Sequence, residues 1–491
     1  MFERIKKISR IWKMLGRTYD AAETTRHNRK HWAKADGADA DALIEPRLST
    51  LRNRARYEIR NNSIAKGIVL TYTNEVVGSG PRLLMQTGNA GFDDEIESGF
   101  EAWAKNPDAA GLLDLGAMLR LMVYQLLECG EAIFVSQNGP AAGNVKLKYL
   151  MIEPDRLATP LGMDPEKVRQ GIEVDDLGRP LFYYFLKRHP GSAYMGSTLG
   201  ENSCNKIPAA RVIHVFRKER PGQTRGVPWL TPSLPLFAQL RRYTLAMIRA
   251  AETAANISGV VQTNSPDVMV ADVADLDAIE MEANSFLTMP AGWGAEQFKA
   301  ENPTATYKEF REQIIGETGR PLNMPLNVTA ANSAGYNFAS GRMDRLSFEK
   351  EKAVVRDWIG GIVIDRILGG FIAEYSNLPA SRLYFPIVQY SHAWAWPGAE
   401  HVDEAKSATA KKTRLETGDT TYADECAAAG KDWKKVFIQR AKENELAEEL
   451  GLPLPHSSPS PVKTENEDDE KDDEEKDDEE KDDEEKDEKV A

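Results

Sequence analysis

The sequence predicts an α+β protein in which long helices flank a region of short strands. Several long segments repeat apolar side chains at helical spacing, whereas residues 131–216 carry short apolar runs separated by turn residues. With 491 residues and 41% hydrophobic content, the chain is also long enough for two or three domains with substantial cores.

Three helices are expected before the strands. Residues 46–78 keep apolar side chains on roughly helical spacing, and Gly78 is a stop signal. A shorter amphipathic helix follows over residues 92–104. The segment "DLGAMLRLMVYQLLECG", residues 114–130, carries its large apolar side chains in one stripe, which is typical of a helix packed on a core.

Four segments are expected to supply strands. Residues 131–139 leave the third helix as a strand, and residues 145–154 and 207–216 are further apolar runs of strand length. Residues 171–189 contain "DDLGRP" between two apolar runs. This arrangement predicts a β-hairpin with those six residues in its turn.

The next part of the chain alternates helices with less regular segments. A helix is expected from Pro232 to Ile257, about 40 Å long at ~1.5 Å per residue. A small mixed module over residues 258–303 and a second helix over residues 304–319 follow it. The segment "NVTAANSAGYNFASGR" has no hydrophobic period and predicts an extended loop before a long helix over residues 343–368.

The C-terminal part of the chain divides into a helical region and a charged end. Residues 400–450 are predicted to be helical, and "LPLPHSSPSPVK" is a linker. The chain then repeats "KDDEE" three times from Lys471. Because this stretch has no apolar surface to bury, it is expected to be disordered.

Charge is distributed unevenly along the chain. The formal net charge is −14, yet residues 463–491 alone hold 19 acidic residues and 6 lysines, a net charge of −13. Residues 1–60 carry 15 basic and 8 acidic residues. Such a basic segment is either an arm for nucleic acid or a surface that packs along acidic neighbours in an assembly.

Common enzyme, metal and membrane signatures are missing from the sequence. It has no Walker loop, no dinucleotide-binding glycine pattern and no HExxH, so neither a cofactor nor a metal is expected. The three cysteines are widely spaced, which suits synthesis in a reducing compartment. Without a long apolar run or a signal-like N-terminus, membrane insertion and export are not expected.

The segment "RKERPGQTRGVPWLTP", residues 217–232, has two interpretations. Its arginines and glycines precede a predicted helix, where backbone N–H groups favour anions, so a nucleic-acid enzyme or NTPase using residues 217–226 is one alternative. Its three prolines remove donors and fix φ, which favours a stiff elbow. The elbow is preferred, with its arginines paired to acidic groups rather than to a free anion.

Several long motifs carry a resemblance to a known family. They are "IEPDRL", "QGIEVDDLGRPLFYYFL", "IPAARVIHVFRKERPGQTRGVPWLTPSL" and "WPGAEHVDEAKSATAKKTRLETGDTTYADECAAAGKDWKKV". In this order they resemble the portal proteins of tailed bacteriophages, in the lambda-like branch. The resemblance runs from about residue 10 to residue 452 and leaves out the acidic tail.

The resemblance implies a non-enzymatic conduit for DNA, built as a ring of twelve subunits at one capsid vertex. It implies a portal-protein fold with a wing, a two-helix stem, a small α/β clip and a helical crown. The expected division is an N-terminal arm and wing over residues 1–230, a first stem helix over 231–257, a clip over 258–303, a second stem helix and turn over 304–326, a channel (tunnel) loop over 327–340, a long helix and wing strand over 341–399, a crown over 400–452 and a disordered acidic tail over 453–491.

Partners and site residues follow from the same resemblance. The expected partners are other copies of the chain, double-stranded DNA in the channel, the terminase large subunit, the major capsid and scaffolding proteins and a head–tail connector protein. The ring would be assembled in the host bacterial cytoplasm and end in the virion. Residues expected to face DNA are Asn327, Asn332, Ser333, Tyr336, Asn337, Arg342 and Arg345, and the wing–stem joint is expected at Arg220, Gly222, Arg225, Gly226, Pro228 and Trp229.

Overall fold

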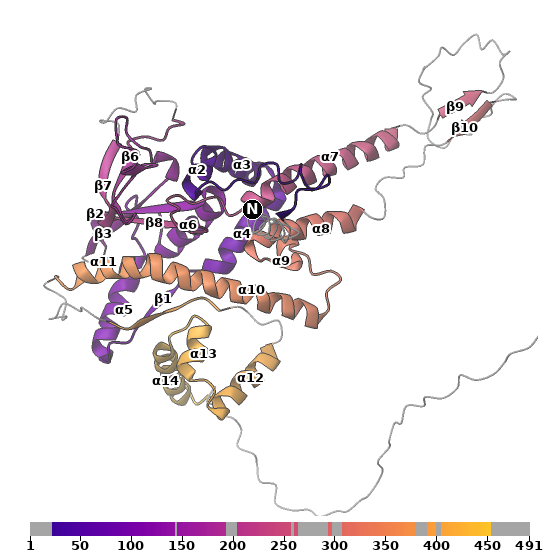
Figure 1. Cartoon of the computed structure of the whole chain (residues 1–491). Coiled ribbons are helices and arrows are strands. Elements are labelled where there is room, and N and C mark those ends of the chain that lie inside the picture. Colours follow the sequence, from indigo (N-terminus) through magenta and orange to yellow (C-terminus); the bar gives the residue numbers. More distant parts are fainter. Residues whose placement is uncertain are drawn as a thin grey trace, which may run out of the picture. The chain divides into compact units, whose positions relative to one another are not determined.

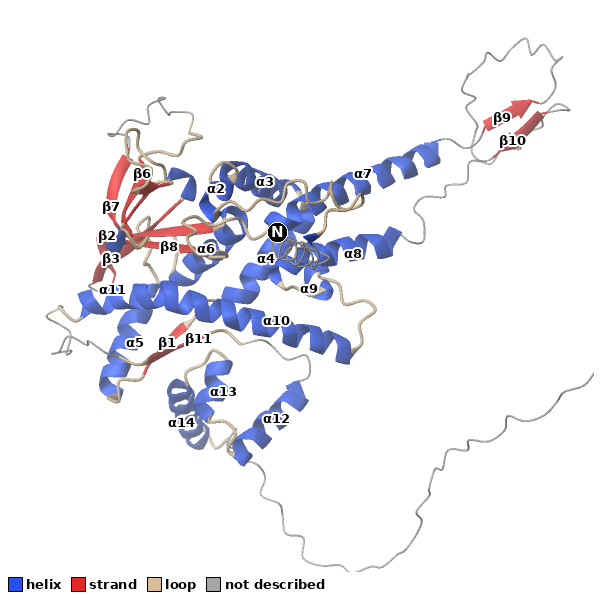
Figure 2. Cartoon of the chain, in the orientation of Figure 1, coloured by secondary structure: helices blue, strands red, loops and turns tan. Residues whose placement is uncertain are grey.

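A computed structural model gives the structure of the chain (Figures 1 and 2). It describes residues 22–142, 145–192, 204–256, 260–263, 293–296, 307–378, 390–398 and 404–452. The structure divides into two units, Met1–Lys431 and Asp432–Ala491. The acidic tail and most of the expected clip lie outside the described residues, so the predicted disorder of the tail stays a prediction.

The single helix predicted over residues 46–78 is in fact two helices. Helix α3 (Leu48–Asn61) ends and helix α4 (Ser63–Val77) begins at Asn62, whose side chain accepts a hydrogen bond from the Ile64 N–H. Asparagine is a favoured N-cap because its oxygen satisfies a free donor of the first turn. Apolar spacing continues across Asn62, so periodicity alone missed the break. The short helix α2 (Ala40–Ile44) precedes them.

The next two predicted helices are confirmed. Helix α5 (Ala90–Ala104) follows the N-cap residue Asn89, and helix α6 (Leu115–Cys129) follows the N-cap residue Asp114. In both helices the side-chain oxygen of the N-cap residue accepts hydrogen bonds from N–H groups of the first turn. Gly130 ends α6 in the left-handed conformation, with φ +83°. Such a backbone suits glycine, because a side chain there is strained.

A three-stranded antiparallel sheet follows α6. Strand β2 (Glu131–Ala142) lies between β3 (Val145–Ile152) and β8 (Val212–Phe216). The single strand predicted over residues 207–216 is wrong. Its first residues belong to β7 (Cys204–Pro208) in another sheet, and a 3-10 turn over Ala209–Arg211 separates β7 from β8. Pro208 ends β7 because it has no N–H to donate to a ladder.

A second antiparallel sheet has four strands in the order β4, β5, β6, β7. Strands β4 (Val168–Arg169), β5 (Ile172–Val174) and β6 (Pro180–Leu186) pair in sequence. The predicted hairpin is confirmed as β5 and β6. The Asp175 carboxylate closes its turn by accepting hydrogen bonds from the Leu177 and Arg179 N–H groups.

Strand β2 separates two hydrophobic cores. Its side chains alternate, with Ala132 and Phe134 in a large core shared with the helices, and Ile133 and Val135 in a smaller core shared with the second sheet. Successive strand residues point to opposite faces, so a strand buried on both sides joins two layers. Helices, first sheet and second sheet are therefore stacked as layers (Figure 2).

Two antiparallel helices extend away from the core beside each other (Figure 1). Helix α7 (Leu234–Asn256) and helix α8 (Tyr307–Gly319) contact through Tyr243, whose ring centroid lies 5.2 Å from that of Phe310. The buried Ser233 hydroxyl donates to the Thr318 carbonyl at 2.8 Å. Between the helices the structure describes only a two-stranded ladder of β9 (Val260–Thr263) and β10 (Trp293–Glu296).

The extended loop predicted over residues 327–340 is shorter than expected. Its start is the helix α9 (Leu326–Ala330), and its end already belongs to α10 (Phe338–Ile359). The amide-rich sequence hides α9 because a five-residue helix shows too little periodicity. A π-helical turn over Gly360–Ile364 joins α10 to α11 (Asp365–Tyr375), so the long helix predicted here continues past its expected end.

The remaining elements are short strands and the C-terminal helices. Strand β1 (Arg82–Met85) pairs with the distant β11 (His392–Ala395). The helical prediction for residues 400–450 is confirmed by α12 (Glu404–Thr417), α13 (Tyr422–Ala428) and, in the second unit, α14 (Trp433–Glu449). None of the helices in the described ranges has an apolar stretch long enough to cross a bilayer.

Candidate functional site

The elbow segment, residues 217–232, connects β8 to the start of α7. It lies against α6 and β2, because the Trp229 N–H donates to the Leu126 carbonyl and the Gly226 N–H donates to a Glu131 carboxylate oxygen at 2.6 Å. All six residues predicted for a joint lie in this segment: Arg220, Gly222, Arg225, Gly226, Pro228 and Trp229. Arg225, Gly226, Pro228 and Trp229 are buried, while Arg220 and Gly222 are exposed.

A buried ion pair holds the centre of the elbow. The Arg225 guanidinium donates through Nε to both carboxylate oxygens of Glu131, at 2.9 and 3.1 Å. Its two terminal nitrogens donate to the backbone carbonyls of Gln170 and Pro154, each at 3.0 Å. A buried charge is tolerated when it is paired and fully hydrogen-bonded, so Arg225 ties the elbow to three separate parts of the chain.

Two further residues complete this cluster. An Arg52 terminal nitrogen from α3 lies 3.1 Å from Glu131, and the His214 Nε2 atom lies 3.4 Å from it. The Glu131 side chain is 0% exposed. Burial would raise the pKa of Glu131, but Arg225 and Arg52 outweigh it and hold the pKa below its ordinary value. The carboxylate is thus charged and shared between the elbow and α3.

The other two arginines of the elbow are also engaged. The Arg217 guanidinium lies over the Trp229 ring, 4.0 Å from its centroid, and 3.7 Å from the Glu351 carboxylate. Arg220 donates to the backbone carbonyl of Ala38 at 3.0 Å. The prediction that these arginines pair with acidic groups is confirmed for Arg217 and Arg225, whereas Arg220 donates to a backbone carbonyl instead.

Backbone contact explains one glycine of the elbow. A Cβ atom on Gly226 would lie 2.1 Å from the Gly130 carbonyl oxygen and 2.7 Å from Phe216 Cβ. Gly222 is different, because its φ is +83° but a Cβ atom there would have no neighbouring atom within 4 Å. Gly226 is therefore required for close approach and Gly222 only for its turn conformation.

These two glycines give a matched test of the elbow. We expect Gly226→Ala to destabilise the protein by about 1–3 kcal/mol, because the backbone must shift to admit the methyl group. Gly222→Ala should cost about 1 kcal/mol from strain alone. Denaturant unfolding of both variants measures which substitution lowers the free energy of unfolding more. Equal effects would show that the Gly226 contact with Gly130 does not constrain the elbow.

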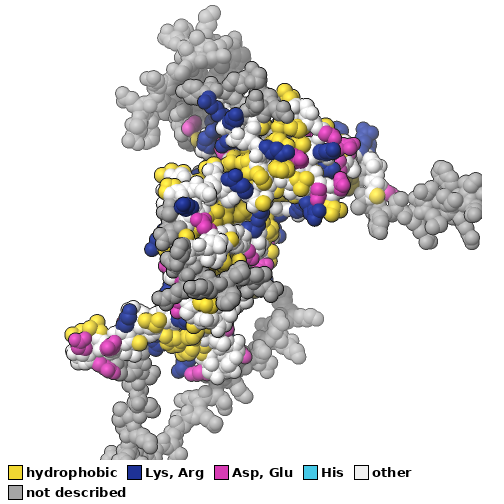
Figure 3. Space-filling view, turned by 90° about the vertical axis from the view of Figure 1, so that its left-hand side faces the viewer, with side chains coloured by type: hydrophobic (Ala, Val, Ile, Leu, Met, Phe, Trp, Pro, Cys, Tyr) yellow, Lys and Arg dark blue, Asp and Glu magenta, His cyan; other side chains and the backbone are white. Residues whose placement is uncertain are grey.

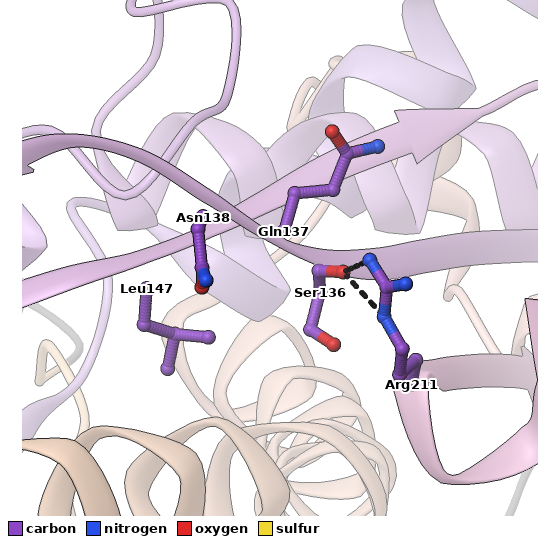
Figure 4. A pocket seen from close by; sticks show the side chains of 5 residues that line it. All are labelled: Ser136, Gln137, Asn138, Leu147 and Arg211. Atoms are coloured by element: carbon purple, nitrogen blue, oxygen red, sulfur yellow. Dashed lines mark hydrogen bonds between the residues drawn. The ribbon is translucent and has the colours of Figure 1, made fainter.

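A shallow pocket of about 240 Å³ lies between the first sheet and α11. A neighbouring pocket that shares some of its walls is shown in Figure 4, where Arg211 donates through two nitrogens to the Ser136 carbonyl at 3.2 and 2.7 Å. The side chains around both pockets include no acid–base pair and no nucleophile beside a base. Within the described ranges no three potential metal ligands come together either.

The residues predicted to face DNA lie in one stretch, apart from the elbow in sequence. Asn327 is in α9 and its side chain accepts from the Val328 N–H, whereas Asn337 caps α10 by accepting from the Ser340 N–H at 2.8 Å. Asn332 and Ser333 are exposed in the short connection, and Tyr336 is half-buried. Only residues 331–337, between α9 and α10, form the non-helical loop that the sequence predicted.

The two arginines after this connection differ in their contacts. Arg345 lies 3.6 Å from both Glu75 and Glu349, so its charge is largely compensated inside the protein. Arg342 is exposed, and no acidic side chain among the described residues lies within ion-pair distance of it. Of the two, Arg342 is therefore the one whose charge is not compensated by a described acidic side chain.

Comparison with known proteins identifies the family. The sequence matches the phage portal protein, lambda family, over residues 25–356. The chain belongs to this family. As a phage portal protein it is a structural protein of the portal vertex and not an enzyme. The enzyme alternative for residues 217–226 has no support.

Relatives of this portal protein match along nearly their whole length. A probable portal protein of Halomonas phage phiHAP-1 is 26% identical, and the alignment covers 95% of this chain and 98% of the relative. Portal protein B of Escherichia phage lambda is 21% identical, and the alignment covers 84% of this chain and 87% of the relative. Among solved structures, a neck of a native GTA particle computed with C12 symmetry is similar at a TM-score of 0.47, with 11% identity over 82% of this chain and 94% of that one.

Sequence reasoning missed the residues that fix the elbow of this portal protein. Glu131 is 94 residues from Arg225, and Arg52 comes from a helix near the N-terminus. The local signal was a charged residue, Glu131, between Gly130 and the apolar run that opens the strand. A charge in a buried strand needs a partner, but periodicity does not say which one.

Proposed function

We propose that this portal protein forms a ring of twelve copies at one capsid vertex, through which double-stranded DNA enters the capsid and later leaves it. The observation that carries the proposal is the order of elements within and beyond the family match: antiparallel sheets, α7, the ladder of β9 and β10, α8, a short connection and the long helix α10. This order supports a wing, a stem of α7 and α8, a clip between them and a channel segment before α10.

The remaining partners follow from the same assignment. The clip, residues 258–303, would dock the terminase large subunit during packaging and a head–tail connector protein afterwards. The wing and the crown, residues 400–452, would meet the major capsid and scaffolding proteins. Assembly would take place in the host bacterial cytoplasm, and the finished ring would remain in the virion.

Apolar side chains on the outer face of α10 support self-assembly. Met343, Leu346 and Val354 are 73%, 54% and 67% exposed, and their spacing places them on the face opposite the buried Phe348 and Val355. Hydrophobic side chains also reach the surface on the side of the molecule shown in Figure 3. An exposed apolar strip is typical of an interface, and a neighbouring copy in a ring would cover it.

Electron microscopy of the purified full chain tests the function. We expect a ring with a central hole, sedimentation as a large oligomer and no ATP hydrolysis. A stable, compact monomer at micromolar concentration would contradict the proposal, and so would hydrolysis of ATP that disappears when Arg217 or Arg220 is replaced.

The apolar strip makes a more local prediction. We expect Leu346→Glu combined with Val354→Glu to convert rings to smaller species, because each interface would have to bury two added carboxylates in place of apolar side chains. Leu177→Glu is the control, since Leu177 is 78% exposed in the turn between β5 and β6. Analytical ultracentrifugation separates the outcomes. Normal rings from the double variant would show that these side chains do not form the interface. They would not contradict the ring itself, which electron microscopy tests.

A further inference from the structure

Helix α3 carries arginines on two faces, and only one face is neutralised. On the inner face, Arg52 pairs with Glu131, and Arg56 lies 2.5 Å from the Asp155 carboxylate. Arg47, which precedes the helix, Arg54 and Arg60 are exposed. Within the described ranges, none of these three has an acidic side chain within ion-pair distance, and α3 contributes no exposed acid of its own, since its Glu58 is buried.

The outer face of α3 also exposes an aromatic ring. Tyr57 is 50% exposed and lies on the arc between Arg54 and Arg60. The guanidinium of Arg241, from α7, lies 6.0 Å from the centroid of this ring. We call Arg47, Arg54, Tyr57, Arg60 and Arg241 the α3 basic face. Apart from the buried Glu58, the nearest acidic residue in sequence is Glu45, which is exposed just before the helix.

The exposed guanidinium groups of Arg47, Arg54 and Arg60, with the half-buried Arg241 beside them, attract a polyanion. Arginine binds carboxylates through two parallel N–H donors, and neighbouring like charges strengthen the attraction to a flexible acidic chain. The chain itself supplies such a segment, since residues 463–491 have a net charge of −13. We propose that the α3 basic face binds the acidic segment 463–491 of a neighbouring copy.

The ring makes this partner favourable, and to that extent the inference rests on the proposed function. In a ring, the segment is tethered to an adjacent subunit, and a short tether gives an effective concentration in the millimolar range. Weak individual ion pairs are then sufficient to tie neighbouring copies together. Duplex DNA, the other available polyanion, has no such tether.

The test uses the chain truncated after Val462 and a fluorescent peptide of residues 463–491. We expect the peptide to bind the truncated chain and to bind more weakly as salt rises. The full-length chain should bind less peptide, because its own acidic segments compete. Arg54→Glu combined with Arg60→Glu should weaken peptide binding by at least roughly tenfold, as expected for the loss of several charge-assisted contacts. The matched control is Lys105→Glu with Lys167→Glu, two exposed lysines that lie outside both α3 and the outer face of α10.

The outcomes separate this inference from the ring. Unchanged peptide binding by the Arg54 and Arg60 variant, or equal loss in the lysine control, would overturn it even if microscopy shows rings. A truncated chain that binds a DNA duplex through Arg54 and Arg60 without competition from the peptide would also overturn it, because DNA would then be the occupant. Tight, specific peptide binding without rings would support the contact and contradict the proposed function.

Discussion

Glu131→Gln is expected to destabilise the protein by about 3–5 kcal/mol, because it leaves two buried guanidinium groups without their shared counter-charge. Glutamine keeps the shape of the side chain and an oxygen for the Gly226 N–H. The loss of stability therefore measures the effect of removing the charge. Arg52 and Arg225 are 4% exposed at their side chains, and water cannot replace the carboxylate. Thermal or denaturant unfolding measures the change.

A surface ion pair provides the control for this experiment. Glu173 pairs with Lys206 at 2.8 Å, and the lysine side chain is 45% exposed. Glu173→Gln should therefore cost less than about 1 kcal/mol. If Glu131→Gln were no more harmful than Glu173→Gln, the buried cluster would not be what holds the elbow against the first sheet.

The same carboxylate gives the protein an acid dependence with a definite sign. The pKa of Glu131 is lowered from its ordinary value of 4.5, with Arg225, Arg52 and His214 facing the group. Its contribution to stability is fully present above pH 4.5, and it is lost as the pH falls toward the folded-state pKa, because the unfolded chain takes up the proton first. The stability gap between wild type and Glu131→Gln should thus be constant near neutral pH and shrink below pH 4.5.

Local patterns predicted most helices and strands because their signals lie within a few residues. The stripe of α6, the β5–β6 hairpin and the cap at Asp114 are all visible in short windows of sequence. The errors arose where one side chain interrupts a continuing pattern. Asn62 caps a new helix inside an apolar period, and Pro208 ends a strand inside an apolar run.

The interior of the elbow could not be predicted in the same way. The contact of Gly226 with Gly130 and the sharing of Glu131 by Arg52 and Arg225 join residues that are distant in sequence. Composition indicated stiffness at residues 217–232, and the prolines justified it. The acidic partner of each arginine is fixed only when β2, α3 and the elbow meet in the folded chain. An ion pair depends on distance in space, so no spacing in the sequence predicts it.

Deleting Ser333, Ala334 and Gly335 is expected to leave rings intact but to abolish packaging or retention of DNA. These residues are exposed between α9 and α10, and Asn332 shapes their turn by accepting from the Ala334 N–H at 2.9 Å. Small and amide side chains could exchange hydrogen bonds with passing phosphates without the fixed charge that would hold DNA in place. Ring assembly and packaged DNA must be measured separately.

The structure shows which residues the deletion must not remove, and it provides controls. Thr329, which is buried and donates to the Pro325 carbonyl at 2.8 Å, and the cap residue Asn337 must be kept, because removing either would disturb α9 or α10. Arg342→Ala should weaken DNA retention modestly through the loss of one phosphate contact, whereas Arg345→Ala should act on stability through Glu75 and Glu349. Normal, full-length packaging by the deletion variant would show that this connection does not serve the channel.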